Sequence, residues 1–242
     1  MTSPNEAYRY SSAAVTERAF AWMGGVFFAA SLVLCTFWYL VPLGRTRPAS
    51  RWPALAIDIG LFAVFALHHS AFARDRVKQR IARAIPDRLL RPIYVWIASG
   101  LLTLVCLLWR PVGGTVYRVG APMSAALILL ELTGVWLITR SVRAIDALEL
   151  AGIRSVATAP TRATLQIKGP YGLVRHPLYL GWIAAVCGHP HMTGDRFAFA
   201  LLSSAYLLIA IPWEERSLEQ TFGGAYEQYR RRVRWRVIPF LY

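Results

Sequence analysis

Four long apolar stretches lie in the first part of the chain, separated by short segments that are rich in arginine. The first stretch contains no charged residue over 22 positions. A helix needs about 17–25 apolar residues to cross the hydrocarbon core of a bilayer. The pattern therefore predicts four membrane-spanning helices, at Phe20–Val41, Trp52–Ala73, Pro92–Trp109 and Val119–Thr139.

A fifth apolar region, Pro177–Trp213, is too long for one crossing, and the polar sequence Thr193–Arg196 interrupts it. This predicts a tight helical hairpin, with one arm over Pro177–Met192 and the other over Phe197–Trp213. We therefore expect an all-α integral membrane protein with about five to six transmembrane helices, of which the last two form the hairpin.

The composition supports a membrane protein and excludes several other classes. The formal net charge is +14, yet charged residues make up only 17% of the chain and hydrophobic residues 56%, whereas soluble domains have about 25% charged residues. The apolar content excludes a disordered chain, and three cysteines in separate apolar runs exclude a disulfide scaffold. A basic nucleic-acid-binding protein would carry its charge on a polar surface, so no nucleic acid partner is expected.

The basic residues are distributed unevenly between the two sides that the spans define. The N-terminal segment, the 74–91 loop, the 140–175 loop and the tail after residue 213 hold 21 Lys and Arg, and the other connections hold 6. Cytoplasmic loops of membrane proteins carry the excess of positive charge. Both termini are therefore expected on the cytoplasmic side of the membrane, and the protein is expected in a bacterial-type inner membrane. Membrane lipid is an expected partner, and anionic lipid in particular would attract the basic segments.

The C-terminal segment Tyr226–Trp235 is rich in aromatic and basic residues, which predicts a helix in the cytoplasmic membrane interface. With this helix, residues 1–242 form a single membrane domain. Residues 20–154 are expected to hold the first four spans and a following helix. Residues 155–242 are expected to hold the hairpin and the tail, and with them the cofactor site.

The sequence from Gly169 to Gly181 is dense in residues that can do chemistry. Proline is favoured at the first position of a helix, so Pro177 predicts a helix start with His176 at its cap. A helix start offers free N–H groups and a partial positive charge to an anion. Arg175 and His176 would add donors for a carboxylate. The alternative is that these residues only mark the membrane boundary.

Glu214 and Glu215 directly follow the second arm of the hairpin. Because the arms are antiparallel, Arg175 and His176 are expected at the same depth as the two glutamates. The glutamates would accept hydrogen bonds from an ammonium or from ribose hydroxyls. Such a site suits a zwitterionic ligand made of a nucleoside and an amino acid. The alternative is an interfacial salt bridge between Arg175 and Glu214.

Two motifs give the chain a resemblance to a known family. Residues 169–181 read Gly-Pro-Tyr-x-x-x-Arg-His-Pro-x-Tyr-x-Gly, and residues 214–229 read Glu-Glu-x-x-Leu-x-x-x-Phe-Gly-x-x-Tyr-x-x-Tyr. They resemble the isoprenylcysteine carboxyl methyltransferase and phospholipid methyltransferase superfamily, whose members are membrane enzymes that use S-adenosylmethionine. Upstream features, including residues 69–74 and 91–95, are similar to the nurim-like branch, which includes bacterial methanethiol S-methyltransferases.

The resemblance implies that S-adenosyl-L-methionine is the cofactor and that six residues line its pocket: Leu165, Tyr171, His176, Pro177, Tyr179 and Glu214. Glu215 is expected to join this site, and Arg175 to contact or support it. Isoprenylcysteine enzymes place an arginine four residues before the first glutamate of the pair, where this chain has Ala210. This difference favours a small thiol as the methyl acceptor over an isoprenylcysteine carboxylate or a phospholipid amine.

His69, near the end of the second span, is the candidate for activating the acceptor. A sulfonium methyl group is already reactive, so the enzyme has to align a nucleophile and exclude water. The reactive form of a thiol is the thiolate, which a base helps to produce. We therefore expect His69 and Arg175 as catalytic residues. The alternative for His69 is a hydrogen bond to a neighbouring helix carbonyl.

No metal ion is expected, although several histidines occur in the spans. His69 should lie about 6 Å from the cytoplasmic side, and His189 about 18 Å along the first arm of the hairpin. Ligands of one ion have to converge on it. Asp58 and Glu131 are expected to hydrogen-bond neighbouring helices. A transporter or a non-catalytic membrane protein is the alternative of another class.

Overall fold

A computed structural model describes residues 4–48, 51–72, 74–157 and 164–242. Residue 73, the expected end of the second span, and residues 158–163, in the expected cofactor-binding part, lie outside the described residues. The described residues are mainly helical, with two short strands. The predicted all-α membrane fold is therefore confirmed.

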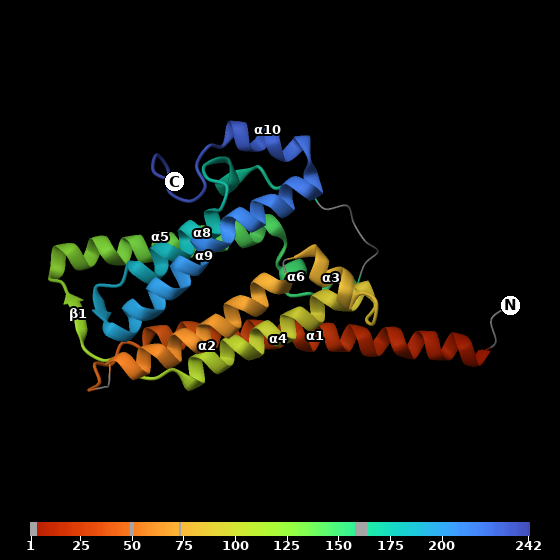
Figure 1. Cartoon of the computed structure of the whole chain (residues 1–242), viewed down its shortest axis with the longest axis horizontal. Helices are drawn as coiled ribbons and strands as arrows, with labels where there is room; N and C mark the ends of the chain where they lie inside the picture. Colours follow the sequence, from red (N-terminus) through yellow and green to blue (C-terminus); the bar gives the residue numbers. More distant parts are fainter. Residues whose placement is uncertain (1–3, 49–50, 73, 158–163) are drawn as a thin grey trace.

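Six helices form two layers (Figure 1). One layer holds α1 (Pro4–Leu40), α2 (Arg51–Phe72) and α4 (Asp87–Leu108). The other layer holds α5 (Ala121–Ile145), α8 (Pro177–Cys187) and α9 (Gly194–Phe222). The shorter elements are α3 (Asp75–Ile81), α6 (Ala147–Leu150), α7 (Arg154–Ala157), η1 (Gly169–Gly172) and α10 (Gly224–Arg232). The layers meet at the end that holds β1 (Thr115–Arg118) and diverge toward α3 and α10 (Figure 1).

Among the described residues, five helices are long and apolar enough to cross a membrane: Ala14–Leu40, Trp52–Phe72, Asp87–Leu108, Ala121–Ile145 and Gly194–Phe222. The helix α8 has 11 residues, which corresponds to a length of about 16 Å. It ends at Cys187 and not at Met192, because Gly188 caps it and Pro190 cannot continue a helix. The first arm of the hairpin is therefore shorter than predicted.

The second arm starts earlier and ends later than predicted. Thr193 is the N-cap of α9, and its hydroxyl accepts a hydrogen bond from the backbone N–H of Arg196 (3.2 Å). The polar sequence there is thus the cap and first turn of a helix, and not a loop. At its other end α9 continues past Glu214 and Glu215 to Phe222, so both glutamates lie on the helix and not after it.

The C-terminal helix α10 is shorter than predicted, because it ends at Arg232 and the chain is extended at Val233. Its two tyrosines, Tyr226 and Tyr229, are buried. They pack against partly buried side chains that include Leu218 of α9. The arginines at positions 230–232 are exposed. The helix therefore has one side against the protein and one basic side that is exposed.

Strands β1 (Thr115–Arg118) and β2 (His191–Thr193) form an antiparallel ribbon that the sequence patterns did not predict. Thr115 pairs with Thr193, and Arg118 pairs with His191. The ribbon joins the α4–α5 connection to the α8–α9 turn, so both connections lie at the same end of the bundle. The helix α1 begins and α9 ends at the opposite end (Figure 1).

Beside the ribbon, the side chains of Asp195 and Arg196 join the two layers through hydrogen bonds. Each residue is only 3% exposed. The guanidinium of Arg196 donates to three backbone carbonyls, those of Tyr39, Leu40 and His191. The carboxylate of Asp195 accepts from the indole N–H of Trp109 and from the backbone N–H groups of Val112 and Gly113. The charge count placed Arg196 in the connection between the hairpin arms, whereas the structure places it in the first turn of α9, where its charge is buried and hydrogen-bonded.

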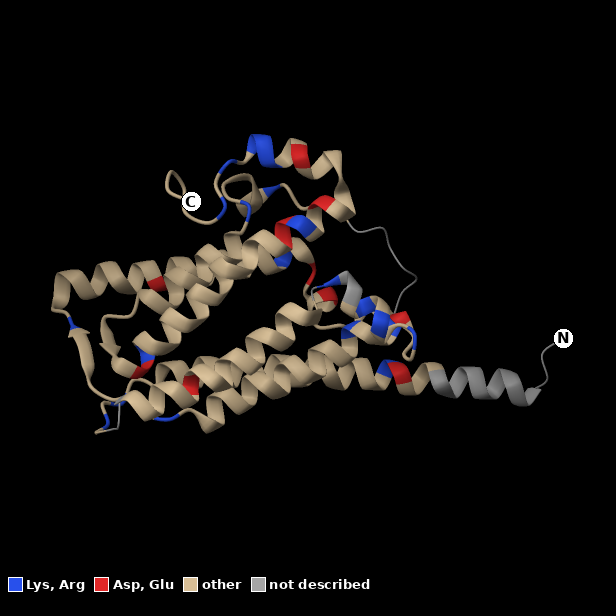
Figure 2. Cartoon of the chain, viewed as in Figure 1, with Lys and Arg blue, Asp and Glu red and all other residues tan. Residues whose placement is uncertain are grey.

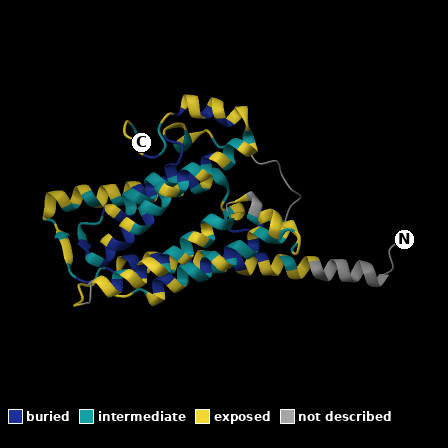
Figure 3. Ribbon diagram, in the orientation of Figure 1, coloured by how far each residue is buried: buried dark blue, intermediate teal, exposed yellow. Residues whose placement is uncertain are grey.

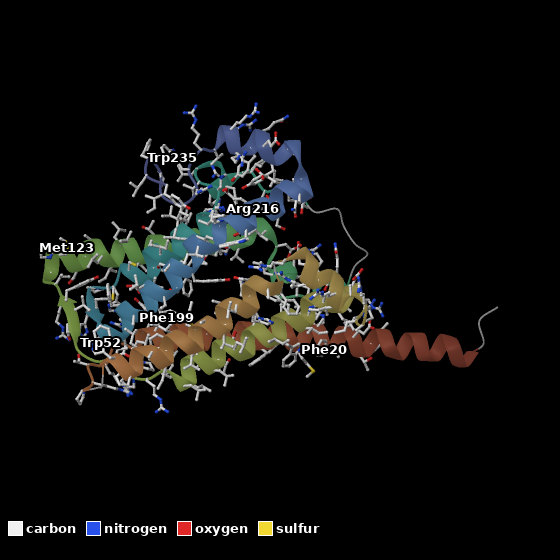
Figure 4. All side chains as sticks on the ribbon, viewed as in Figure 1. Phe20, Trp52, Met123, Phe199, Arg216 and Trp235 are labelled. Carbon is white, nitrogen blue, oxygen red and sulfur yellow. The ribbon has the colours of Figure 1, made fainter. Side chains whose placement is uncertain are left out.

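An aromatic cluster around Phe199 of α9 fills the space where the layers meet (Figure 4). The ring of Trp38 lies edge-on to Phe199, with 5.1 Å between the centroids. Further rings within 6.2 Å of Phe199 include those of Phe62, Trp109 and Trp182. Figure 3 shows exposed residues along the outward sides of the helices, which is the pattern of surfaces that face lipid.

Two glycines allow α5 and α8 to approach one another closely. A Cβ atom added to Gly134 would lie 2.5 Å from the carbonyl oxygen of Gly181, and one added to Gly181 would lie 2.8 Å from that of Gly134. Small residues are enriched where membrane helices pack in this way. The crossing also fixes the position of Pro177, because this residue begins the same helix as Gly181.

We expect Gly181→Ala to destabilise the protein, because the added methyl group has to push α8 away from α5. The expected loss is about 1–3 kcal/mol of unfolding free energy, or on the order of 5 °C in melting temperature. Gly60→Ala is the matched control, since Gly60 lies within α2 with open space around it and alanine favours a helix. Thermal unfolding of the purified variants measures both, and equal melting temperatures would contradict the role of the crossing.

Candidate functional site

The start of α8 is held by the C-terminal segment. Pro177 is the first helical residue and His176 is the cap, as predicted. The backbone N–H groups of Arg175 and His176 donate to the carbonyls of Trp235 (2.9 Å) and Arg236 (2.8 Å). These two donors are occupied by the protein itself. The C-terminal segment therefore fixes the chain directly before the first turn of α8.

Arg175 forms a buried ion pair with Glu215, and each side chain is 6% exposed. Its Nε lies 2.7 Å from Oε1 of this glutamate. Its Nη1 donates to the carbonyls of Val233 (2.9 Å) and Arg234 (2.7 Å). The salt bridge considered between Arg175 and Glu214 is therefore formed with the next residue instead. The guanidinium joins the start of α8 to α9 and to the C-terminal segment.

Glu215 has two further basic neighbours. Its Oε1 lies 3.4 Å from Nε2 of His176, and its Oε2 lies 3.3 Å from Nε of Arg236. On the side of α10, burial raises the pKa of Tyr229 to about 12. The hydroxyl of this tyrosine donates to the carbonyl of Tyr171 at 2.8 Å. The charge of Glu215 is thus compensated within a closely packed junction of α8, α9 and α10.

Glu214 has a different environment, because its side chain is 43% exposed. The hydroxyl of Tyr179 donates to its Oε2 at 2.5 Å, and Nδ1 of His176 lies 3.7 Å from the same oxygen. The rings of His176 and Tyr179 stack with 5.2 Å between their centroids. The predicted neighbourhood of histidine and glutamates is therefore confirmed, and Glu214 is the acidic group in it that stays accessible.

The other predicted cofactor residues lie at the same junction. Pro177 is buried at the start of α8. Leu165 packs against the buried tyrosines of α10. Burial, and next the nearby charge of Glu214, raise the pKa of Tyr171. All residues predicted to line the pocket are thus found where α8, α9 and α10 come together.

His69 lies on α2, in the other layer, and its side chain is exposed. Its Nδ1 is 2.5 Å from the hydroxyl of Tyr94, so this hydrogen bond is to a side chain and not to the helix carbonyl considered above. The ring of Tyr206 on α9 lies 6.1 Å from the imidazole. The hydroxyl of Tyr206 is 3.2 Å from Oγ of Ser70. The imidazole of His69 is thus in ring contact with Tyr206 of the second layer.

Three residues near the candidate site received no role from the sequence: Tyr94, Tyr206 and Arg236. Tyr94 lies in a segment that was noted only for its likeness to a family. Tyr206 is a tyrosine within an apolar run, and this signal could have marked it, because a hydroxyl inside a membrane helix needs a partner. Arg236 gave no signal, since its contact with Glu215 depends on how the tail folds back.

The described part of the chain contains no group of three or more His, Cys, Asp or Glu side chains that could hold a metal ion. His69 belongs to α2, whereas His189 lies beside the ribbon and accepts a hydrogen bond from Nη1 of Arg196 (3.1 Å). Asp58 accepts a hydrogen bond from the backbone N–H of Arg110 (2.8 Å). Asp58 therefore bonds the connection that follows α4, and not a helix as predicted.

Comparison with known proteins gives the chain a family. Methanethiol S-methyltransferase 2 of Bradyrhizobium diazoefficiens is 36% identical over 205 residues, which cover 81% of this chain and 78% of the relative. A methanethiol S-methyltransferase of Crocosphaera subtropica is 37% identical over 198 residues, 78% of this chain and 76% of the relative. Nurim of Xenopus laevis is 30% identical over 167 residues, 63% of this chain and 58% of nurim. No family model and no solved structure matches the chain.

The likeness to the two bacterial relatives extends over most of the chain and is not confined to the two motifs. The likeness to nurim confirms the predicted relation to the nurim-like branch. Five apolar helices of spanning length make the protein an integral membrane protein. The chain is a membrane methyltransferase, and it belongs to the methanethiol S-methyltransferase family.

Proposed function

We propose that this protein transfers a methyl group from S-adenosylmethionine to a small thiol such as methanethiol, in a bacterial-type inner membrane. The observation that carries the proposal is the accessible carboxylate of Glu214 beside Tyr179 and His176. The printed names of the bacterial relatives support the choice of acceptor. In this proposal residues 155–242 of the single domain 1–242 supply the cofactor site, and residues 20–154 supply the acceptor side.

The residues at the junction fit the groups of S-adenosylmethionine. Glu214 can accept hydrogen bonds from an ammonium or from ribose hydroxyls, and its exposure leaves it open to a ligand. The rings of Tyr171, Tyr179 and His176 offer surfaces on which a nucleoside can pack. Three more residues are proposed to support the residues that contact the ligand: Leu165, Pro177 and Glu215.

S-Adenosylmethionine, when bound, supplies a methyl group that is already activated on a sulfonium sulfur. The protein therefore has to align the acceptor, exclude water and take the thiol proton. We propose that His69 takes this proton at Nε2. Its Nδ1 is the nitrogen nearer to the Tyr94 hydroxyl, and with Nδ1–H donating to that oxygen, Nε2 holds the free lone pair. Tyr94 then fixes the orientation of the imidazole.

We propose that the site faces the cytoplasm. Lys and Arg residues are concentrated toward the end of the bundle that holds α3 and α10 (Figure 2). The segments that the spans assign to this side hold 21 of the 27 Lys and Arg, and the positive-inside rule assigns such a side to the cytoplasm. Both termini then share the cytoplasmic side, where the exposed arginines of α10 would meet anionic lipid.

Glu214→Gln is expected to weaken the binding of S-adenosylhomocysteine about 10–100-fold, because the neutral amide loses charge-assisted hydrogen bonds to the ligand. Glu227→Gln is the matched control, since Glu227 is exposed on α10. Isothermal titration of the detergent-purified proteins measures the three affinities. Equal binding by the wild type and both variants would refute the cofactor site.

Arg175→Ala is expected to lower both the melting temperature and the affinity for S-adenosylhomocysteine, because we propose Arg175 as a positioning residue. The variant leaves Glu215 as a buried, unpaired carboxylate, which costs about 3–5 kcal/mol; this is on the order of 10 °C in melting temperature. Glu214→Gln should keep a melting temperature close to that of the wild type. If Arg175→Ala lost binding at an unchanged melting temperature, Arg175 would instead contact the ligand directly.

With a labelled methyl donor, methanethiol is expected to give labelled dimethyl sulfide, which headspace gas chromatography measures. His69→Ala should lower this rate about 100-fold or more near neutral pH, because a positioned base is lost. His191→Ala, at the ribbon end of the bundle, should keep the rate. Label that entered only prenylcysteine or phospholipid would refute the small-thiol acceptor but not the enzyme class.

A further inference from the structure

Tyr206 occupies a central position between the two layers. It lies on α9, and its ring packs 6.1 Å from that of Phe62 and 6.1 Å from the imidazole of His69, both on α2. Its hydroxyl is 3.2 Å from Oγ of Ser70, also on α2. Tyr206 is therefore a side chain that bridges the layers on the side of His69.

The space on the ribbon side of Tyr206 is filled. The aromatic cluster around Phe199 lies there, and Tyr206 packs against it. The indole N–H of Trp182 on α8 donates to Oγ of Ser203 (3.0 Å), which closes the contact between α8 and α9 at this depth. Tyr206 is thus at the boundary of the packed core, with the candidate site on its other side.

On that other side, α9 carries a small residue. Ala210 follows Tyr206 by one turn, and Glu214 follows Ala210 by another. At 1.5 Å per residue, Ala210 lies about 6 Å and Glu214 about 12 Å further along the helix axis. Ala210 therefore places only a methyl side chain between Tyr206 and the carboxylate that we propose for the cofactor.

Side chains of α8 and α4 also lie near this part of α9. The hydroxyl of Tyr179 on α8 donates to Glu214, which lies about two turns beyond Tyr206 on α9. Tyr94 on α4 binds His69. The residues proposed for the cofactor and the candidate base His69 therefore surround one short region. Tyr206 lies at the end of this region that is nearer to the ribbon.

We propose that Tyr206 is the floor of the acceptor site and restricts the acceptor to a short thiol. This inference rests on the proposed function, and it adds the residue that determines specificity. A longer alkyl chain bound with its sulfur near His69 would collide with the tyrosine ring. Removing the side chain extends the site toward Phe62, which the ring now contacts, and toward Ser70, which the hydroxyl now contacts.

The test compares methyl transfer to methanethiol and to 1-butanethiol by the full-length, detergent-purified protein. In Tyr206→Ala, the ratio of kcat/KM for butanethiol to that for methanethiol is expected to rise about tenfold or more, as accommodated methylene groups contribute to binding. Tyr206→Phe keeps the ring and should keep the wild-type ratio. Ile209→Ala is the matched control, since Ile209 is exposed on the same helix, and it should keep that ratio too.

An unchanged ratio in Tyr206→Ala, or a wild type that prefers butanethiol, would overturn the inference while leaving thiol methylation intact. A wild type that methylates neither thiol would instead refute the proposed function. If Tyr206→Ala does not fold, as judged by binding of S-adenosylhomocysteine, Tyr206→Leu replaces it. Leucine still shortens the side chain and should raise the same ratio, and no rise in this variant would count equally against the inference.

Discussion

The buried ion pair between Arg175 and Glu215 is the interaction on which the organisation of the candidate site depends. A charge without a partner in such a place costs several kcal/mol, so each group is stable there only because the other compensates it. The guanidinium also binds carbonyls of the C-terminal segment, and the carboxylate is close to His176 and Arg236. One pair thereby joins three parts of the chain that are distant in sequence. The neighbouring Glu214 is left with Tyr179 and an exposed side, which is the condition for binding a polar ligand.

The two ends of the bundle differ in how firmly the layers are joined. At the ribbon end, Asp195 and Arg196 make hydrogen bonds to the connections of both layers, and the aromatic cluster around Phe199 fills the space beside them. At the other end the layers diverge (Figure 1), and a hydrogen bond between Tyr206 and Ser70 links α9 to α2. A methyl transfer that needs no strong acid or metal requires mainly a shielded place where donor and acceptor meet. In the proposed function, the residues around Glu214, Tyr206 and His69 would form that place.

The sequence predicted the long helices well because spans are set by apolar length alone. It also brought His176 and the glutamates together, since an antiparallel hairpin leaves no other arrangement. It failed where backbone hydrogen bonds decide the outcome. The polar residues before Arg196 looked like a loop, yet a cap and buried partners make them the first turn of α9. The choice between Glu214 and Glu215 as the partner of Arg175 depends on the rotation of α9, which adjacent identical residues do not reveal. The contacts of Tyr206 come from another helix, and no linear pattern in the sequence records them.

The most direct test is a structure of the protein determined with S-adenosylhomocysteine bound. We expect the ammonium or the ribose of the ligand within hydrogen-bonding distance of Glu214, and its sulfur directed toward the region between Tyr206 and His69. The ion pair of Arg175 and Glu215 should be retained behind the ligand. A ligand bound at the ribbon end, or one separated from Glu214 by other side chains, would contradict the proposed site.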